Sequence, residues 1–334
     1  MTTPAPSASA RPSVGVAMCV YNGERYVRAQ LDSIAAQTER PSRLVVLDDG
    51  STDGTWDLLQ AWAATAPFPV HAERNASKLG VVRNFERACA LLETDLIFLS
   101  DQDDVWYPDK VRIFVDTFVS DPKLTLLHSD ADLIDGSGER LGRRLFDTLL
   151  VTAQERELVA SGKAWQVYAK RNLVTGAACA FRRELLDAAR PFSAAWVHDE
   201  WLAFHAALAG RVRIWPEPVM AYRLHGSNTV GLPLPTLGWR LRTTWQAFLK
   251  PTSPRQRVRA ERLDEITAVA CRLGAEAAAI EHLQEAAGHA RFRAALPRNP
   301  LKRLAGIQRE HRAGHYNAWS NGPVSMLHDF LIAR

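Results

Sequence analysis

Apolar runs alternate with amphipathic stretches along the first 130 residues of the chain. Five short runs are typical of strands buried on both faces: 14–20, 44–47, 70–73, 95–100 and 124–128. Four segments between them carry apolar residues at helical spacing: 24–38, 56–64, 81–92 and 108–119. Strands separated by helices of this length predict parallel pairing through right-handed crossovers. The predicted fold class is α/β, with a mostly parallel sheet flanked by helices.

Polar residues follow the ends of three predicted strands. The first strand runs into YNGE at 21–24, the second into DDGS at 48–51, and the fourth into SDQDD at 100–104. Ligands of such sheets bind beyond the carboxyl ends of the strands. The three turns are therefore expected to converge on one edge of the sheet, where they would form a binding site.

The third turn contains three acids in four positions, Asp101, Asp103 and Asp104. Carboxylates this close repel one another, and a neighbouring buried strand raises the cost of desolvating them. A cation is the simplest compensation for this charge, so the turn predicts a cation site.

Two common binding motifs are not supported. The segment DGSTDG at 49–54 begins like an EF-hand loop, but its twelfth position is Gln60 instead of Glu, and a strand-like run precedes it. The motifs GxGxxG and GxxxxGK[ST] are absent. Their absence argues against a dinucleotide-dependent dehydrogenase and against a P-loop NTPase.

Length and composition indicate a main domain with an appendage. A chain of 334 residues with 47% hydrophobic and 23% charged residues is an ordinary globular protein, longer than one typical domain. No apolar run reaches the ~18–20 residues that span a bilayer. Residues 1–12 are rich in Pro, Ala and Ser and lack an apolar core, which predicts a disordered leader instead of a signal peptide. The four cysteines are widely spaced, which predicts reduced core cysteines in a cytoplasmic protein.

The C-terminal region, 232–334, is basic and predicted to be helical. It holds 16 Lys or Arg against 8 Asp or Glu, whereas the rest of the chain has a balance of −4. Helices are predicted at 255–273, 275–295 and 316–331. Segment 237–249 interleaves tryptophans with arginines, which is typical of a helix on an anionic membrane surface, peripheral to the plasma membrane. A helical cap packed on the main domain is the alternative, and no recognised module supports nucleic-acid binding.

Six ordered motifs carry a resemblance to a known family: CVYNGERYVRAQLDSIAAQT, VVLDDGSTDGT, FLSDQDDVW, NLVTGAACAFR, HDEW and YRLHGSN. Over about residues 13–230 they resemble family-2 glycosyltransferases with the Rossmann-like GT-A fold. The last motifs are similar to the bacterial rhamnosyltransferase-like branch, which builds surface polysaccharides. The resemblance implies a GT-A domain at 13–231 followed by the basic helical region.

The resemblance implies that the acidic turn binds a divalent metal, Mn²⁺ or Mg²⁺, together with the diphosphate of a nucleotide sugar. Asp101-Gln102-Asp103 matches the family's DxD motif, with Asp103 nearest the metal and Asp101 acting through metal-bound water or the ribose. His225 matches the family's C-terminal histidine and is a further candidate metal ligand, with an ordinary loop histidine as the alternative. Asp104 is expected to be a helix N-terminal acid instead.

The first two turns are implied to bind the nucleobase and the rest of the donor. The Asp49 carboxylate accepts the base N–H, with Asp48 as a partner in that role and an Asx-turn as the alternative. Lys78, Arg83 and Asn84 contact diphosphate or ribose, unless they are solvated helix-start residues. The implied donor-binding set is Val20, Tyr21, Asn22, Asp48, Asp49, Lys78, Arg83, Asp101 and Gln102.

Inversion at the anomeric carbon requires a base that takes the proton of the acceptor hydroxyl. Asp199 in HDEW matches the family's base, and Glu200 is the competitor. Trp201 is expected to stack on a sugar, and Gly176, Glu200 and Trp201 form the implied acceptor-binding set. Asp199 can also cap the predicted helix 200–209, and the two roles are compatible.

These motifs predict an inverting, metal-dependent glycosyltransferase. The expected donor is dTDP-L-rhamnose, and the expected acceptor is a growing, lipid-linked surface polysaccharide. A UDP-hexose transferase of the same fold is the nearest alternative. A non-catalytic protein that binds nucleotide sugars or glycans is the alternative from another class, although a binding protein has no need of a base such as Asp199.

Overall fold

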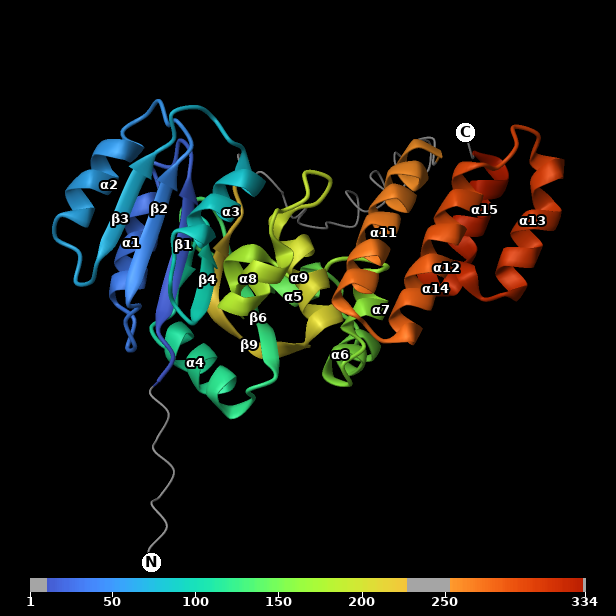
Figure 1. The fold of residues 1–334 in the computed structure, drawn as a ribbon. Helices are drawn as coiled ribbons and strands as arrows, with labels where there is room; N and C mark the ends of the chain where they lie inside the picture. The colour runs from blue at the N-terminus through green and yellow to red at the C-terminus, as the bar shows by residue number, and fades with distance from the viewer. Residues whose placement is uncertain (1–10, 227–252, 333–334) are drawn as a thin grey trace, which may run out of the picture. The chain divides into compact units, whose positions relative to one another are not determined.

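The computed structural model describes residues 11–226 and 253–332 (Figure 1). They form two compact units. The first comprises residues 11–145, 175–192 and 213–225, and the second comprises 146–174, 193–212, 226 and 253–332. Most of the expected leader and all of the expected interfacial helix at 237–249 lie outside the described residues.

One mixed sheet forms the centre of the first unit. The sheet has nine strands among the described residues. Eight of them lie in the order β3-β2-β1-β4-β8-β6-β9-β5, and β7 pairs with β6. The strands are β1 (Val14–Val20), β2 (Arg43–Asp48), β3 (Val70–Arg74), β4 (Leu96–Ser100), β5 (Val105–Trp106), β6 (Leu124–Ile134), β7 (Arg140–Arg144), β8 (Cys179–Arg182) and β9 (Arg211–Arg223).

The first four strands along the chain confirm the predicted α/β class. β3, β2, β1 and β4 are parallel neighbours, joined by helices that pack beside them (Figure 1). All five residues of β4 are buried, as expected for a strand covered on both faces. The helices and the short 3₁₀ turn of this unit are α1 (Val27–Ala35), α2 (Thr55–Ala63), α3 (Val81–Ala90), α4 (Lys110–Ser120), η1 (Gly176–Ala178) and α8 (Arg183–Ala189).

The rest of the sheet is antiparallel, which the alternation of strands and helices did not predict. β8 pairs antiparallel with both β4 and β6, and β5 pairs antiparallel with β9. The strand expected at 124–128 is longer and continues to Ile134. β8 separates it from the parallel strands, so it does not extend their parallel order.

The second unit is helical. In Figure 1, α11 and α12 lie side by side, and the later helices pack against α12 and one another. The helices outside the sheet unit are α5 (Leu145–Thr148, at the boundary), α6 (Ala153–Ala160), α7 (Ala164–Tyr168), α9 (His198–Ala209), α11 (Ser253–Leu273), α12 (Ala277–Ala294), α13 (Pro300–Arg312), α14 (His315–Trp319) and α15 (Pro323–Leu331).

The prediction of one helix over 316–331 was wrong. α14 ends at Trp319 and α15 begins at Pro323, because Gly322 adopts a φ of +53° and Pro323 occupies the first turn of the new helix. The expectation of core cysteines holds for Cys89 and Cys179, which are buried free thiols, whereas Cys271 is exposed.

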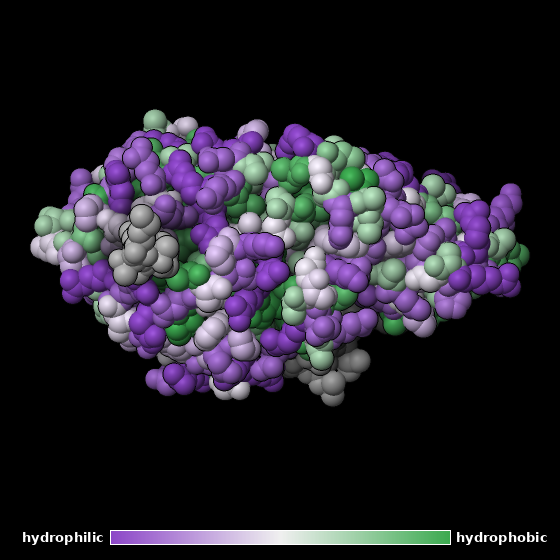
Figure 2. Space-filling view, turned by 60° about the horizontal axis from the view of Figure 1, so that its bottom comes forward, coloured by the Kyte–Doolittle hydropathy of each residue, from purple (hydrophilic) through white to green (hydrophobic). Residues whose placement is uncertain are grey.

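The described surface carries mixed side chains. On the face drawn in Figure 2, hydrophilic side chains predominate, and hydrophobic ones form smaller patches between them. Among the described residues, no helix combines the length and the apolar character needed to cross a bilayer.

Candidate active site

Three turns meet at the carboxyl edge of the parallel strands, as predicted. In the sheet register Val20 lies beside Asp48, and Met18 lies beside Ser100. Tyr21, Asp49 and Asp101 each follow the end of one strand. β2, β1 and β4 are neighbours, so the three turns occupy the same edge.

The Gln102 side chain joins the first turn to the acidic turn. Its Oε1 accepts the Tyr21 N–H at 2.8 Å, and its Nε2 donates to the Tyr21 carbonyl at 3.1 Å. Gly23 makes room for this amide, because a Cβ at that position would lie 2.3 Å from the Gln102 Oε1 atom. The structure therefore places Gln102 against the protein backbone.

Asn22 joins the first turn to the second. It has a φ of +49°, a conformation in which Asn is enriched. Its Oδ1 accepts the Thr52 N–H at 2.8 Å, and its own N–H donates to the Ser51 hydroxyl at 2.9 Å. The tip of the site is thus fixed by hydrogen bonds within the protein.

Asp48 and Asp49 have different partners. Asp48 is fully buried, accepts the Ser51 N–H at 2.9 Å, and lies 3.2 Å from Arg74 Nε. Asp48, and not Asp49, therefore accepts a backbone N–H within the second turn, from the residue three positions on. The Asp49 carboxylate instead accepts the N–H groups of Leu79 at 2.7 Å and Gly80 at 2.9 Å, and thereby anchors the loop before α3.

Lys78 and Arg83 lie in different surroundings. The exposed Lys78 ammonium sits 3.4 Å from the centre of the Tyr21 ring, and so beside the first turn. Arg83 pairs with Glu86 one turn along its own helix, at 2.6 Å. Of the two, Lys78 is the cation that the structure brings to the first turn.

The Asp103 side chain contacts that of His225, which lies just after the end of β9. The Asp103 Oδ2 atom lies 2.7 Å from His225 Nε2, and both side chains are largely buried. The ring of His225 packs on Tyr26, with centroids 4.9 Å apart. Two candidate metal ligands that are 122 residues apart in the sequence are thus in contact. Asp101, the third candidate, is half-buried.

Arg223 was missed as a site residue, although it stands two positions before His225 in the YRLHGSN motif. Its backbone N–H donates to Asp104 Oδ1 at 2.9 Å, and its Nε donates to the Asp103 carbonyl at 2.7 Å. Its guanidinium also lies 4.8 Å from the centre of the Tyr26 ring. Arg223 therefore ties the end of β9 to the acidic turn and positions His225.

The expectation that Asp104 is a helix N-terminal acid was wrong. Asp104 precedes β5, and the next helix, α4, has Asp109 as its N-cap. Burial raises the pKa of Asp104 well above its ordinary value, and the nearby charges of Asp103 and Asp101 raise it further. Beneath the turn, the buried Lys110 donates to the Ala177 carbonyl at 2.6 Å.

Gly176 and the expected catalytic base belong to different units. Gly176 begins the buried turn η1 in the first unit, next to Ala177. Asp199 lies in the first turn of α9 in the second unit. The helix begins at His198 with Val197 as its N-cap, so Asp199 is not the cap, and its Oδ1 accepts the adjacent Glu200 N–H at 2.6 Å.

Glu200 and Trp201 both have close neighbours within the second unit. Glu200 forms an ion pair with Arg262, whose guanidinium lies 3.8 Å from the centre of the Trp196 ring. Trp201 is buried and packs on His205, with ring centroids 4.4 Å apart. Its ring is therefore part of an aromatic cluster at the start of α9.

The potential metal ligands at the acidic turn suit a divalent ion. The Asp103 carboxylate and the His225 imidazole offer an oxygen and a nitrogen at one point, and first-row divalent ions accept both. Asp101 does not complete a tight group of three with them. Across residues 11–226 and 253–332, the one group of three His, Cys, Asp or Glu ligand atoms within 4.8 Å of one another lies elsewhere, at His289, Glu310 and His315.

Comparison with known proteins identifies the family. The family model described as glycosyl transferase family 2 matches residues 15–188, more than half of the chain. The chain belongs to this family, which confirms the expectation of a glycosyltransferase at family level. Its fold is also found in Staphylococcus aureus TarS in complex with UDP-GlcNAc, with a TM-score of 0.57, 14% identity, and coverage of 95% of this chain and 81% of that one.

Among curated proteins, an uncharacterized glycosyltransferase of Nostoc is 27% identical over 225 residues, 64% of this chain and 66% of that protein. A dTDP-rhamnosyl transferase of Shigella flexneri is 34% identical over 106 residues, 30% of this chain and 37% of that protein. The aligned part is less than two thirds of the length of either relative. A mannosyltransferase of Pyrobaculum calidifontis in complex with GDP-Man and Mn²⁺ shares the fold, with a TM-score of 0.50, 21% identity, and coverage of 97% of this chain and 88% of that one.

Proposed function

We propose that the protein is an inverting, metal-dependent glycosyltransferase that transfers a sugar from a nucleotide-sugar donor to a hydroxyl of a surface glycan. The observation that carries this proposal is the contact of Asp103 with His225 at the carboxyl edge of the sheet, beside the turns that follow β1 and β2. Nucleotide ligands of α/β folds bind at this edge.

L-rhamnose from dTDP-L-rhamnose is the proposed sugar. The similarity to the Shigella dTDP-rhamnosyl transferase supports it, as do the ordered motifs DQDDVW, HDEW and YRLHGSN. A Salmonella typhimurium abequosyltransferase, 29% identical over 122 residues, also supports the transfer of a sugar. The proposed acceptor is a lipid-linked glycan.

Asp103 and His225 would hold the divalent ion, Mn²⁺ or Mg²⁺, with Asp101 beside them. Such ions are commonly bound by one or two carboxylates together with substrate phosphates, so two or three side chains suffice. The mannosyltransferase complex with GDP-Man and Mn²⁺ supports this assignment. When bound, the ion neutralises the negative charge of the diphosphate leaving group.

The remaining residues of the edge position the donor. The Lys78 ammonium, stacked on the exposed Tyr21 ring, supplies positive charge for the diphosphate. Asp49 holds the loop at Leu79 and Gly80 and retains acceptor capacity for a base N–H. Gln102 acts on the donor indirectly, because its amide holds the backbone of the first turn.

Asp199 is the proposed general base. It has to accept the proton of the acceptor hydroxyl as that oxygen attacks the anomeric carbon. Its neighbour Glu200 is paired with Arg262, which leaves Glu200 less suited to take a proton. Asp199 is half-buried in the first turn of α9. The positive end of the helix dipole lies there, and it stabilises a negatively charged side chain.

The test is a transfer assay with dTDP-L-rhamnose, UDP-glucose, UDP-GlcNAc and GDP-mannose, each with Mn²⁺, Mg²⁺ or a chelator. The expected result is metal-dependent turnover, fastest with dTDP-L-rhamnose. Asp103→Asn should remove metal-dependent donor binding, whereas the matched substitution of the exposed Asp57 on α2 should not. Faster turnover of a UDP-hexose would reject rhamnose. Donor binding without turnover of any sugar would reject the enzyme in favour of a binding protein.

A further inference from the structure

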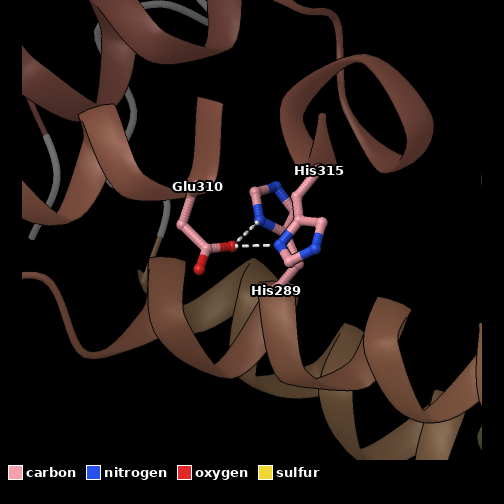
Figure 3. A group of neighbouring side chains, drawn as sticks. All are labelled: His289, Glu310 and His315. Atoms are coloured by element: carbon pink, nitrogen blue, oxygen red, sulfur yellow. Dashed lines mark hydrogen bonds and ion pairs between the residues drawn. The ribbon is translucent and has the colours of Figure 1, made fainter. Parts of the chain in front are cut away.

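Three side chains of the helical unit converge on one point (Figure 3). His289 comes from α12, Glu310 from α13, and His315 from the start of α14. The Nδ1 atoms of both imidazoles lie 2.8 Å from the same oxygen, Glu310 Oε2. Three helices thus place their ligand-type atoms together, although the proposed transferase activity uses none of them.

Aromatic side chains pack against His289, the most buried member of the cluster. The side chain of His289 is 2% exposed, that of Glu310 11%, and that of His315 27%. Tyr316 and Trp319 pack against the His289 ring, with centroid distances of 4.9 and 5.9 Å. The cluster is therefore shielded on the His289 side and more open at His315, which leaves a route for a small ion and a place for water as a further ligand.

Two neutral imidazoles and one carboxylate carry a net charge of −1, which suits a divalent cation. This set of nitrogen and oxygen donors is typical of Zn²⁺ and its neighbours in the first transition row. Ligand atoms about 2.1 Å from a tetrahedral ion are about 3.4 Å apart, so the present 2.8 Å contacts need to open by about 0.6 Å. Each imidazole stays neutral if its proton moves from Nδ1 to Nε2.

His289 has a hydrogen-bond partner for a proton on Nε2. His289 Nε2 lies 3.1 Å from Ser320 Oγ, which also accepts a hydrogen bond from Arg293 at 2.8 Å. The charge of Arg293 is balanced by its ion pair with the buried Asp329, at 2.6 Å. A polar partner on the second ring nitrogen is the usual arrangement for a metal-binding histidine, because it fixes the ring orientation.

We propose that His289, Glu310 and His315 form a binding site for a divalent transition-metal ion of the Zn²⁺ type. The ion would link α12, α13 and α14 and thereby stabilise the helical unit. Asp103 and His225 belong to the other unit, so this site shares no ligand with the metal site proposed for catalysis.

The test uses the full-length, tag-free protein, stripped with a chelator and then titrated with Zn²⁺ or Co²⁺. We expect one ion per chain at this site, a higher melting temperature with Zn²⁺, and the visible absorption of four-coordinate Co²⁺. His315→Gln should abolish the Co²⁺ spectrum and the gain in melting temperature. Ser320→Ala should weaken binding by about 10–100-fold, the usual cost of removing the outer partner of a metal ligand.

His311→Gln is the matched control, because His311 is an exposed histidine of the same helix as Glu310. It should leave both signals unchanged, as should Asp103→Asn. If His315→Gln fails to fold, Glu310→Gln and the wild-type Co²⁺ spectrum decide the question. Absence of the four-coordinate Co²⁺ spectrum in the wild type would overturn the proposal. Loss of the signal in Asp103→Asn but not in the cluster variants would do the same.

Discussion

Substitution of Lys110 tests whether a neutral amine lies beneath the acidic turn. Lys110 is fully buried, and its Nζ lies 3.9 Å from the centre of the Trp106 ring as well as 2.6 Å from the Ala177 carbonyl. Burial lowers the pKa of Lys110 from 10.5 to about 7. Lys110→Met removes the amine and keeps an unbranched side chain of similar length.

The stabilities of the two proteins should then respond differently to pH. Because the pKa is lower in the folded state, the contribution of Lys110 to stability is complete above pH 10.5 and is lost as the pH falls toward 7. Raising the pH from 7.5 to 9.5 should therefore increase the unfolding free energy of the wild type by about 2.5 kcal/mol more than that of Lys110→Met. Urea unfolding at both pH values, followed by tryptophan fluorescence, measures this difference.

Lys123→Met is the matched control, since Lys123 is an exposed lysine of the same unit. Its unfolding free energy should follow that of the wild type between the two pH values. Equal changes in wild type and Lys110→Met would refute the reasoning. They would mean that the buried amine keeps its proton and that an ionised Asp104 balances it.

Three further predictions concern the donor, the base and the membrane. Gly23→Ala should push the Gln102 amide off the first turn and weaken donor binding, and it should add no further loss in a Gln102→Ala background. Asp199→Asn should keep donor binding, and its transfer rate should fall by about 10²–10⁴-fold. The transfer rate of Glu200→Gln should fall much less. The opposite pattern at equal melting temperatures would show that Glu200 is the base. If 237–249 forms an interfacial helix, the protein should co-sediment with anionic vesicles in a salt-sensitive way, and equal binding to neutral vesicles would contradict this.

The parallel half of the fold was predictable because its signals are local. A continuous apolar run such as 14–20 indicates a strand buried on both faces, and the intervening helices dictate parallel order. The antiparallel half depends on distant pairings such as Leu126 with Phe181, which no local pattern records. The break before α15 also has a local signal, because Asn321-Gly322-Pro323 is typical of a helix end followed by a new helix start.

The sequence predicted which turns form the candidate site, but not which contacts each residue of a turn makes. Asp48 and Asp49 are adjacent acids in the sequence, and only the fold shows that Asp48 bonds the Ser51 N–H of its own turn while Asp49 bonds the loop before α3. Gln102 matched the variable position of a motif, yet its amide makes two hydrogen bonds to the Tyr21 backbone. Such contacts depend on the spacing of two turns about 80 residues apart.

The repulsion expected among Asp101, Asp103 and Asp104 is distributed unequally by the fold. Asp104 is buried and accepts the Arg223 N–H, and burial raises its pKa, so it takes up a proton more readily than an ordinary aspartate. Asp103 faces His225, and Asp101 lies half-buried at the edge of the sheet. The negative charge that a cation would offset is therefore expected mainly on Asp103 and Asp101. One or two carboxylates is also the number that typically holds a divalent ion when substrate phosphates complete its coordination.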